Sequence, residues 1–205
     1  MFKKIIIILY FILLITSFDA EAKKIRLPSV SENNIFTYTN PKAKINVIGF
    51  IGGGGIKKGI GKSQNPLARE RKAFKRSGMN YYVFPNPKIG KGISLSYRKN
   101  KDHIKRISRL IKHIKKKNNL PIILVGHSRG SVSVSAAANV LGQDEIKGIV
   151  VMGSLTATSQ KIKPPFLISN MLKKTTVPVL IIHHKEDRCI VTPFSPAKSI
   201  SEKKG

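Results

Sequence analysis

A serine between two glycines is the part of this chain with the clearest chemical potential. Residues 121–130 read PIILVGHSRG, so Ser128 follows an aliphatic run and lies between Gly126 and Gly130. A serine hydroxyl is a weak nucleophile at neutral pH, so an enzyme must expose it, place a base beside it and supply donors for the oxyanion. A sharp strand-to-helix turn exposes the hydroxyl, and flanking glycines remove side chains that would collide. The spacing therefore predicts that Ser128 is a nucleophile on a strained turn.

The residues around this motif decide between two interpretations. The pattern G-x-S-x-G also occurs by chance, and an isolated match is then a glycine-bounded turn with a solvated serine. Here residues 122–125 form a short aliphatic run suited to a strand buried on both faces. Residues 131–141, which include three consecutive alanines, suit a packed helix. This context favours the nucleophile over the solvated turn.

The oxyanion formed by such a nucleophile needs at least two donors, and backbone amides are the expected source. One donor should be the amide of Arg129, directly after the nucleophile. The other should come from the run of four glycines at 52–55, where the absence of side chains lets the backbone approach a substrate oxygen. We expect Gly53 or Gly54 to serve. The alternative is a flexible glycine loop without this role.

The acid that orients a catalytic base usually follows a strand, where the carboxyl edge of the sheet opens into the site. Asp187 meets this description because it follows the aliphatic run 179–182. Glu186 is the rival acid, and a solvated surface carboxylate is the alternative to both. We predict that Asp187 is the acid.

None of the five histidines is a convincing general base. His103 and His113 belong to an amphipathic helix and are expected at the surface, and His127 lies inside the turn with its side chain expected to point away from the oxyanion. His183 and His184 end the strand before Asp187, so they are the candidates that could line the site. A histidine is more often packed or solvated than catalytic, and that alternative applies to all five.

The glycine-rich region also resembles a phosphate-binding loop without matching it. A P-loop has four residues between its first glycine and Gly-Lys-Ser, whereas Gly55 is followed by five residues before Gly61-Lys62-Ser63. Nor does any window match the dinucleotide pattern G-x-G-x-x-G. We expect neither a metal nor a cofactor.

The order of elements from Lys44 onward alternates strand and helix, which argues for a parallel sheet covered on both faces. We predict a three-layer α/β/α sandwich with a mainly parallel sheet. The expected strands cover residues 45–51, 81–84, 122–125, 149–152 and 179–182, and the expected helices cover 66–76, 103–117 and 131–141. The polar, proline-containing excursion 153–176 is expected to form a cap or a surface loop, and its 164–167 apolar run suggests an acyl pocket.

The first residues have the outline of a secretory signal peptide. Lys3 and Lys4 precede a mostly apolar run from Ile5 to Phe18, and small residues at Ala20 and Ala22 follow. The competing interpretation is an uncleaved anchor, but the run is shorter than the roughly 18 to 20 residues that span a bilayer. We expect cleavage near Ala22, export to the periplasm or beyond, and a single domain over residues 23–205.

Basic residues dominate the charge of the chain. Lysine and arginine number 38 against 10 acidic residues, for a formal charge of +28. Such a field attracts any anionic polymer or surface. The lysines are spread over most segments with few aromatics placed to stack on bases, which argues against specific nucleic-acid binding. We expect a monomer with electrostatic association to anionic cell-envelope surfaces and a small acyl compound as substrate.

In the order of its motifs the chain resembles the α/β-hydrolase superfamily from about Ile45 to Thr192. The resemblance rests on the strand with its glycine-rich loop, the elbow at 126–130 and the acid after a later strand; Tyr97-Arg98 and Asp102-His103 are weaker matches. It is similar to exported bacterial lipase-like or esterase-like hydrolases. The resemblance implies a serine hydrolase with Ser128 as nucleophile.

This chain departs from the pattern of the α/β-hydrolase superfamily in its catalytic histidine and its cysteine. In this family the catalytic histidine lies in a loop after one further strand beyond the acid, and similar proteins pair a cysteine after the acid with one near that histidine. Cys189 is the only cysteine here, and an odd cysteine in an exported chain suggests a free thiol or a missing partner. The expectation is therefore a truncated hydrolase, or a non-catalytic relative that binds an anionic or acyl ligand.

Overall fold

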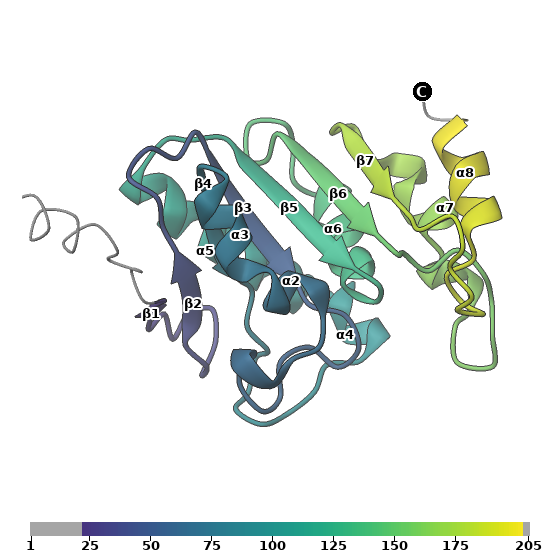
Figure 1. The fold of residues 1–205 in the computed structure, drawn as a ribbon, viewed down its shortest axis with the longest axis horizontal. Coiled ribbons are helices and arrows are strands. Elements are labelled where there is room, and N and C mark those ends of the chain that lie inside the picture. Colours follow the sequence, from purple (N-terminus) through teal and green to yellow (C-terminus); the bar gives the residue numbers. More distant parts are fainter. Residues whose placement is uncertain (1–21, 203–205) are drawn as a thin grey trace, which may run out of the picture.

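The computed structural model describes residues 22–202 as a seven-stranded sheet with helices on both faces (Figure 1). The predicted signal peptide lies outside the described residues except for Ala22. The strands are β1 Lys23–Ile25, β2 Ile35–Tyr38, β3 Ile45–Phe50, β4 Met79–Val83, β5 Ile122–His127, β6 Gly148–Met152 and β7 Val179–Ile182. The α-helices are α2 Pro66–Arg69, α3 Arg71–Arg76, α4 Leu95–Arg98, α5 Lys101–Lys117, α6 Gly130–Ala138, α7 Ile168–Met171 and α8 Phe194–Glu202, with short 3₁₀ turns at Ile60–Lys62, Pro164–Phe166 and Leu172–Lys174.

The strand order is β1-β2-β4-β3-β5-β6-β7. All pairs from β4 to β7 are parallel, whereas β1–β2 and β2–β4 are antiparallel. The expected mainly parallel sheet is therefore present. The sequence analysis did not predict β1 and β2, which extend one edge.

Two cores lie on opposite faces of the sheet. α5 and α6 cover one face, where apolar side chains of α5 such as Ile107, Leu110 and Ile114 are fully buried. α2 and α3 cover the other face over β3 and β4 (Figure 1). The sheet thus forms the middle of three layers, and its carboxyl edge carries the loops that follow β3, β5, β6 and β7.

The helix predicted over residues 66–76 is in fact two short helices. Asn65 caps the first, because its side chain accepts a hydrogen bond from the Leu67 amide. Glu70, with φ −89° and ψ 15°, lies outside the helical region and separates α2 from α3.

The prediction that His103 lies at the surface is wrong. His103 is 0% exposed. It precedes Ile107 by four residues, so it extends the buried stripe formed by Ile107, Leu110 and Ile114 by one helical turn.

The excursion 153–176 packs into the core through several of its apolar side chains. Leu155, Ile162, Ile168 and Leu172 are buried in the cluster that includes α6. Phe166 and Leu167, expected in an acyl pocket, are partly buried against the same cluster. This segment therefore supports the flank of α6.

β7 is the edge strand of the described sheet beyond β6. Leu180 and Ile182 alternate along it and are 56% and 44% exposed. They pair in register with Val150 and Met152 of β6. In Figure 1 no helix of the described residues lies in front of β5, β6 and β7. This apolar sheet face is only partly covered.

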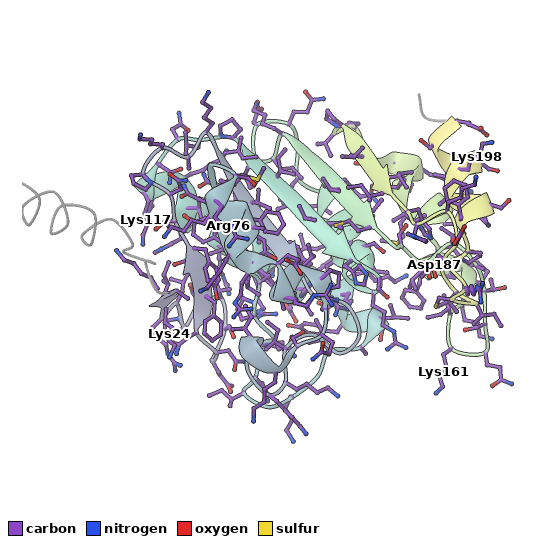
Figure 2. The ribbon with its side chains drawn as sticks, viewed as in Figure 1. Lys24, Arg76, Lys117, Lys161, Asp187 and Lys198 are labelled. Atoms are coloured by element: carbon purple, nitrogen blue, oxygen red, sulfur yellow. The ribbon has the colours of Figure 1, made fainter. Side chains whose placement is uncertain are left out.

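Basic side chains surround the molecule on every side in the view of Figure 2. Lys24, Lys117, Lys161 and Lys198 lie at well-separated positions of the outline. No helix within residues 22–202 is both long and apolar enough to cross a bilayer. The charge is thus a property of the whole surface, as its distribution in the sequence indicates.

Candidate active site

Ser128 occupies a strained turn between β5 and α6. Its φ is 52°, and it is the only non-glycine residue with positive φ among the described residues. The left-handed region is disfavoured for side-chain-bearing residues because of steric contact with Cβ. The Ser128 amide donates to the Met152 carbonyl at the end of β6, 2.9 Å away, which holds the turn against the sheet. The predicted strained elbow is therefore present.

The glycines around the elbow are required by close backbone contacts. A Cβ on Gly126 would lie 2.5 Å from the Gly130 carbonyl oxygen, and one on Gly130 would lie 2.0 Å from the Phe50 carbonyl oxygen. A Cβ on Gly52 would lie 3.0 Å from the Ser128 Cβ. No ordinary side chain fits these spaces. The loop after β3 and the turn after β5 are thus in direct contact, as an oxyanion site requires.

The three amides proposed as oxyanion donors are free. Within residues 22–202, the amides of Gly53, Gly54 and Arg129 have no hydrogen-bond acceptor, whereas the neighbouring Gly55 amide donates to Gly52 and the Ser131 amide donates to Ser128. Unpaired backbone donors are uncommon, and a cluster of them can receive a developing negative charge.

The Ser128 hydroxyl likewise has no hydrogen-bond partner among the described residues. No histidine ring is therefore bonded to it. The elbow supplies the nucleophile position and the donors, and leaves proton removal to another group.

His127 is fixed by Asn65, a residue that the sequence analysis did not single out. The Asn65 Oδ1 accepts from the Leu67 amide, so its Nδ2 faces His127 Nδ1 at 2.9 Å and donates to it. The His127 proton then resides on Nε2. Burial lowers the pKa of His127 by more than the Asp187 carboxylate raises it, so the ring is neutral at pH 7. Asn65, which caps α2, thereby sets the tautomer of His127.

Asp187 organises the loop after β7. One carboxylate oxygen accepts from the Cys189 amide at 2.9 Å and the other from the Thr192 hydroxyl at 2.8 Å. Burial raises the pKa of Asp187, but these two hydrogen bonds and the nearby His183 and His184 together lower it below its ordinary value. The carboxylate is ionised and held in place, and Figure 2 shows it near the carboxyl end of β7.

His183 lies beside Asp187 but is turned into the protein. Its Nε2 is 3.6 Å from Asp187 Oδ2 and donates to the Thr192 carbonyl, which can only accept. Its Nδ1 is buried without a hydrogen-bond partner in residues 22–202, and the side chain is 2% exposed. The structure thus brings together the predicted acid and one predicted base candidate as a histidine–carboxylate pair.

His184, the other candidate base, is exposed. Its Nδ1 accepts a hydrogen bond from the Glu186 amide at 3.1 Å, so that nitrogen is engaged within its own loop. Glu186, the rival acid, is exposed and makes no ion pair in the described residues. The structure therefore favours Asp187 over Glu186 as an ordered carboxylate.

Neither a metal site nor a disulfide is formed in the described part of the chain. No group of three or more His, Cys, Asp or Glu side chains lies close enough to hold an ion between residues 22 and 202. Cys189 is a free, exposed thiol.

Comparison with known proteins finds similarity at the level of structure. No protein-family model matches the sequence, and no curated protein is similar to it. An α/β serine hydrolase without a lid from Xanthomonas campestris is 11% identical with a TM-score of 0.63, over 91% of this chain and 80% of that one. An α/β serine hydrolase homologue from Coxiella burnetii is 14% identical with a TM-score of 0.57, over 91% and 83%. A monoacylglycerol lipase from Paleococcus ferrophilus is 16% identical with a TM-score of 0.54, over 82% and 83%.

These similarities show the fold. The chain has the α/β fold of serine hydrolases, and its candidate nucleophile lies at the end of β5, an interior strand of the sheet.

Proposed function

We propose that this chain is a serine hydrolase of the α/β-hydrolase type acting on a carboxylic ester or a related acyl compound. The observation that carries the proposal is the strained Ser128 beside three unpaired amides, of Gly53, Gly54 and Arg129. A folded protein retains backbone strain and unpaired donors where the surrounding structure imposes them, and both features serve acyl transfer.

In this reaction the Ser128 Oγ attacks the carbonyl carbon while its proton passes to a base. The carbonyl electrons move to oxygen, and the resulting oxyanion accepts hydrogen bonds from the Arg129 amide and a glycine amide. Collapse of the intermediate breaks the bond to the alkoxide, which takes up the proton. Water then attacks the acyl-enzyme in the same way, which releases a carboxylic acid and restores the serine.

The base has two candidate sources. Within the described residues the first is His183, which Asp187 already contacts; it would have to turn from the Thr192 carbonyl toward the site. The second is a histidine outside the described residues, on a segment that packs on the sheet face where Leu180 and Ile182 are exposed. His183→Gln and a version extended through the downstream reading frame distinguish them.

A second function is favoured by the unbonded Ser128 hydroxyl. A relative without a working base would bind an acyl or anionic ligand in the same place without turnover. Such a protein would bind an ester at equilibrium and release it unchanged, and a steep loss of binding with salt would mark an electrostatic contribution.

We further propose that the chain is exported after cleavage near Ala22 and acts as a monomer at the cell envelope. The high positive charge, +28 over the whole sequence, supports association with anionic envelope surfaces. The mass of the mature protein in cell fractions tests the cleavage site.

Hydrolysis of p-nitrophenyl esters of increasing chain length tests the enzymatic proposal. We expect turnover by the purified chain, loss of at least about 10³-fold in Ser128→Ala, and unchanged turnover in Ser199→Ala, which removes an exposed serine hydroxyl far along the chain. Equal activity in Ser128→Ala would exclude the proposed nucleophile. Binding without turnover in all three proteins would favour the second function.

A further inference from the structure

The buried arginine Arg98 lies directly behind the glycine loop. It is the last residue of α4 and is 1% exposed. Its Nη2 donates to the carbonyls of Ile51 and Gly53, at 2.9 and 3.1 Å, and its Nη1 donates to Ser133 Oγ at 3.0 Å. One guanidinium therefore connects the loop after β3 to α6, the helix that begins at the elbow.

These contacts determine the direction of the loop amides. In a planar trans peptide the N–H points opposite to the C=O of the preceding residue. Because Arg98 binds the Gly53 carbonyl, the Gly54 amide points away from the guanidinium. The Gly54 carbonyl is itself held, by Asn86 Nδ2 at 2.9 Å and the Ile93 amide at 3.1 Å. The free Gly54 amide is thus fixed by interactions on both sides of it.

The same guanidinium supplies an uncompensated charge. No carboxylate in residues 22–202 forms an ion pair with Arg98, which is bonded only to neutral oxygens. Burial, and secondarily the charge of Arg129, lower its pKa to about 10, so it is still protonated at neutral pH. A buried charge acts through a low dielectric and is felt strongly over short distances.

Ser133 links this arginine to His103. Its hydroxyl oxygen accepts from Arg98, and the same hydroxyl shares a hydrogen bond with His103 Nε2 at 2.9 Å. Burial, with the charges of Arg106 and Arg98, lowers the pKa of His103 to about 3, so the ring is neutral and can accept. The network thus joins α4, α5 and α6 behind the loop.

We propose that Arg98 is a positioning residue for the oxyanion site: it holds the Ile51–Gly54 backbone with the Gly54 amide directed at the substrate oxygen, and it adds positive potential behind that amide. The proposal rests on the proposed function, because it assigns the Gly54 amide as a loop donor to the oxyanion of that reaction.

A second buried arginine provides a matched control. Arg106 is 7% exposed and donates to the carbonyls of Val30 and Pro85, and its guanidinium lies 5.0 Å from the centre of the Phe84 ring. Within residues 22–202, none of its hydrogen bonds reaches the glycine loop. It therefore shares the burial, the charge and the carbonyl acceptors of Arg98, but in another place.

The first experiment compares Arg98→Met, Arg98→Lys and Arg106→Lys by the second-order rate constant for labelling with a fluorophosphonate, whose phosphoryl oxygen takes the oxyanion position. Thermal unfolding and near-UV circular dichroism verify that each variant is folded. We expect a loss of about 100-fold for Arg98→Met and about 10-fold for Arg98→Lys, which retains the charge but not the fork geometry. Arg106→Lys should label within about twofold of the wild type. Equal rates for folded Arg98 and Arg106 variants would overturn the proposal.

The second experiment does not depend on activity. The ¹⁵N heteronuclear NOE is measured on glycine-labelled protein for Gly53, Gly54 and Gly142. We expect ordered values for Gly53 and Gly54 in the wild type and in Arg106→Lys, and lower values in Arg98→Lys, with Gly142 unchanged. If the wild type shows this NOE pattern but is not labelled, the hydrolase proposal is refuted, whereas the positioning of the glycine loop by Arg98 is retained. Unchanged Gly53 and Gly54 values in folded Arg98→Lys would refute the positioning role of Arg98 alone.

Discussion

The elbow and the acid loop are the two halves of the candidate site, and they are built differently. Around Ser128 the backbone is packed so tightly that glycine is required at several positions, and the buried Arg98 holds the adjoining loop. Around Asp187, exposed residues follow an edge strand, and the order comes from a few local hydrogen bonds. The core therefore fixes the loop and the turn that carry the candidate oxyanion donors, whereas the loop that carries Asp187 depends on polar contacts near solvent.

We expect the largest loss of stability from a substitution in the closely packed elbow around Ser128. In Gly130→Ala the added methyl group would lie 2.0 Å from the Phe50 carbonyl oxygen, so the backbone must move. We expect a loss of about 3 kcal/mol in the free energy of unfolding by urea denaturation. Gly142→Ala is the control, because a Cβ there meets nothing within 4 Å. Equal effects of the two substitutions would contradict the packing of the elbow.

Acidification should lower the free energy of unfolding through His103, which belongs to the buried network with Arg98 and Ser133. The pKa of His103 is about 3 in the folded chain and about 6.5 when unfolded. Between these values only the unfolded chain takes up the proton, so the free energy of unfolding falls as the pH falls from 6.5. We expect this group to contribute a loss of about 2 kcal/mol between pH 7.5 and pH 5. Denaturation of His103→Gln at both pH values should show a smaller loss than that of the wild type, and an equal loss in the two proteins would contradict this assignment.

Relief of the backbone strain should stabilise the chain. Ser128→Gly places a residue that tolerates positive φ where Ser128 has φ 52°. We expect a gain of about 1 kcal/mol in the free energy of unfolding. Ser128→Ala keeps the strain and should show no such gain. A destabilised Ser128→Gly variant would mean that the hydroxyl, and not the turn, governs this position.

The smallest effect is expected in the acid loop. Thr192→Val removes the hydroxyl that donates to Asp187 and leaves the Cys189 amide in place. The pKa of Asp187 should rise toward its ordinary value, and stability should fall by about 0.5 to 1 kcal/mol. NMR titration of the Asp187 carboxyl measures the first effect and urea denaturation the second. If Thr192→Val lowered the free energy of unfolding as much as Gly130→Ala, the elbow and the Asp187 loop would not differ in how they are stabilised.

Much of the sheet was predictable because its strands are short aliphatic runs in an alternating order. The range 179–182 agrees with β7, and β5 extends the predicted 122–125 through the glycine to His127. β1 and β2 were missed because β1 joins the sheet only through β2, and the pairing of β2 with β4 is decided by contacts distant in the sequence and not by a local pattern.

The local part of the candidate site was predictable for a related reason. The Gly126 and Gly130 spacing encodes the elbow directly, and the structure contains it. Arg98, Asn65 and Ser133 carry no spacing signal, because their partners lie far along the chain and meet them only in the folded protein. The buried position of His103 could have been inferred by extending the apolar stripe of its helix one turn toward the amino end.

Labelling of the purified chain with a fluorophosphonate probe, followed by location of the adduct by mass spectrometry, tests whether Ser128 is an activated nucleophile. We predict a single adduct on Ser128 that is absent from Ser128→Ala and retained in Ser199→Ala. Labelling that persists in Ser128→Ala would mean that Ser128 is not the labelled nucleophile. Absence of labelling in both the 205-residue chain and the version extended through the downstream reading frame would mean that Ser128 is not activated.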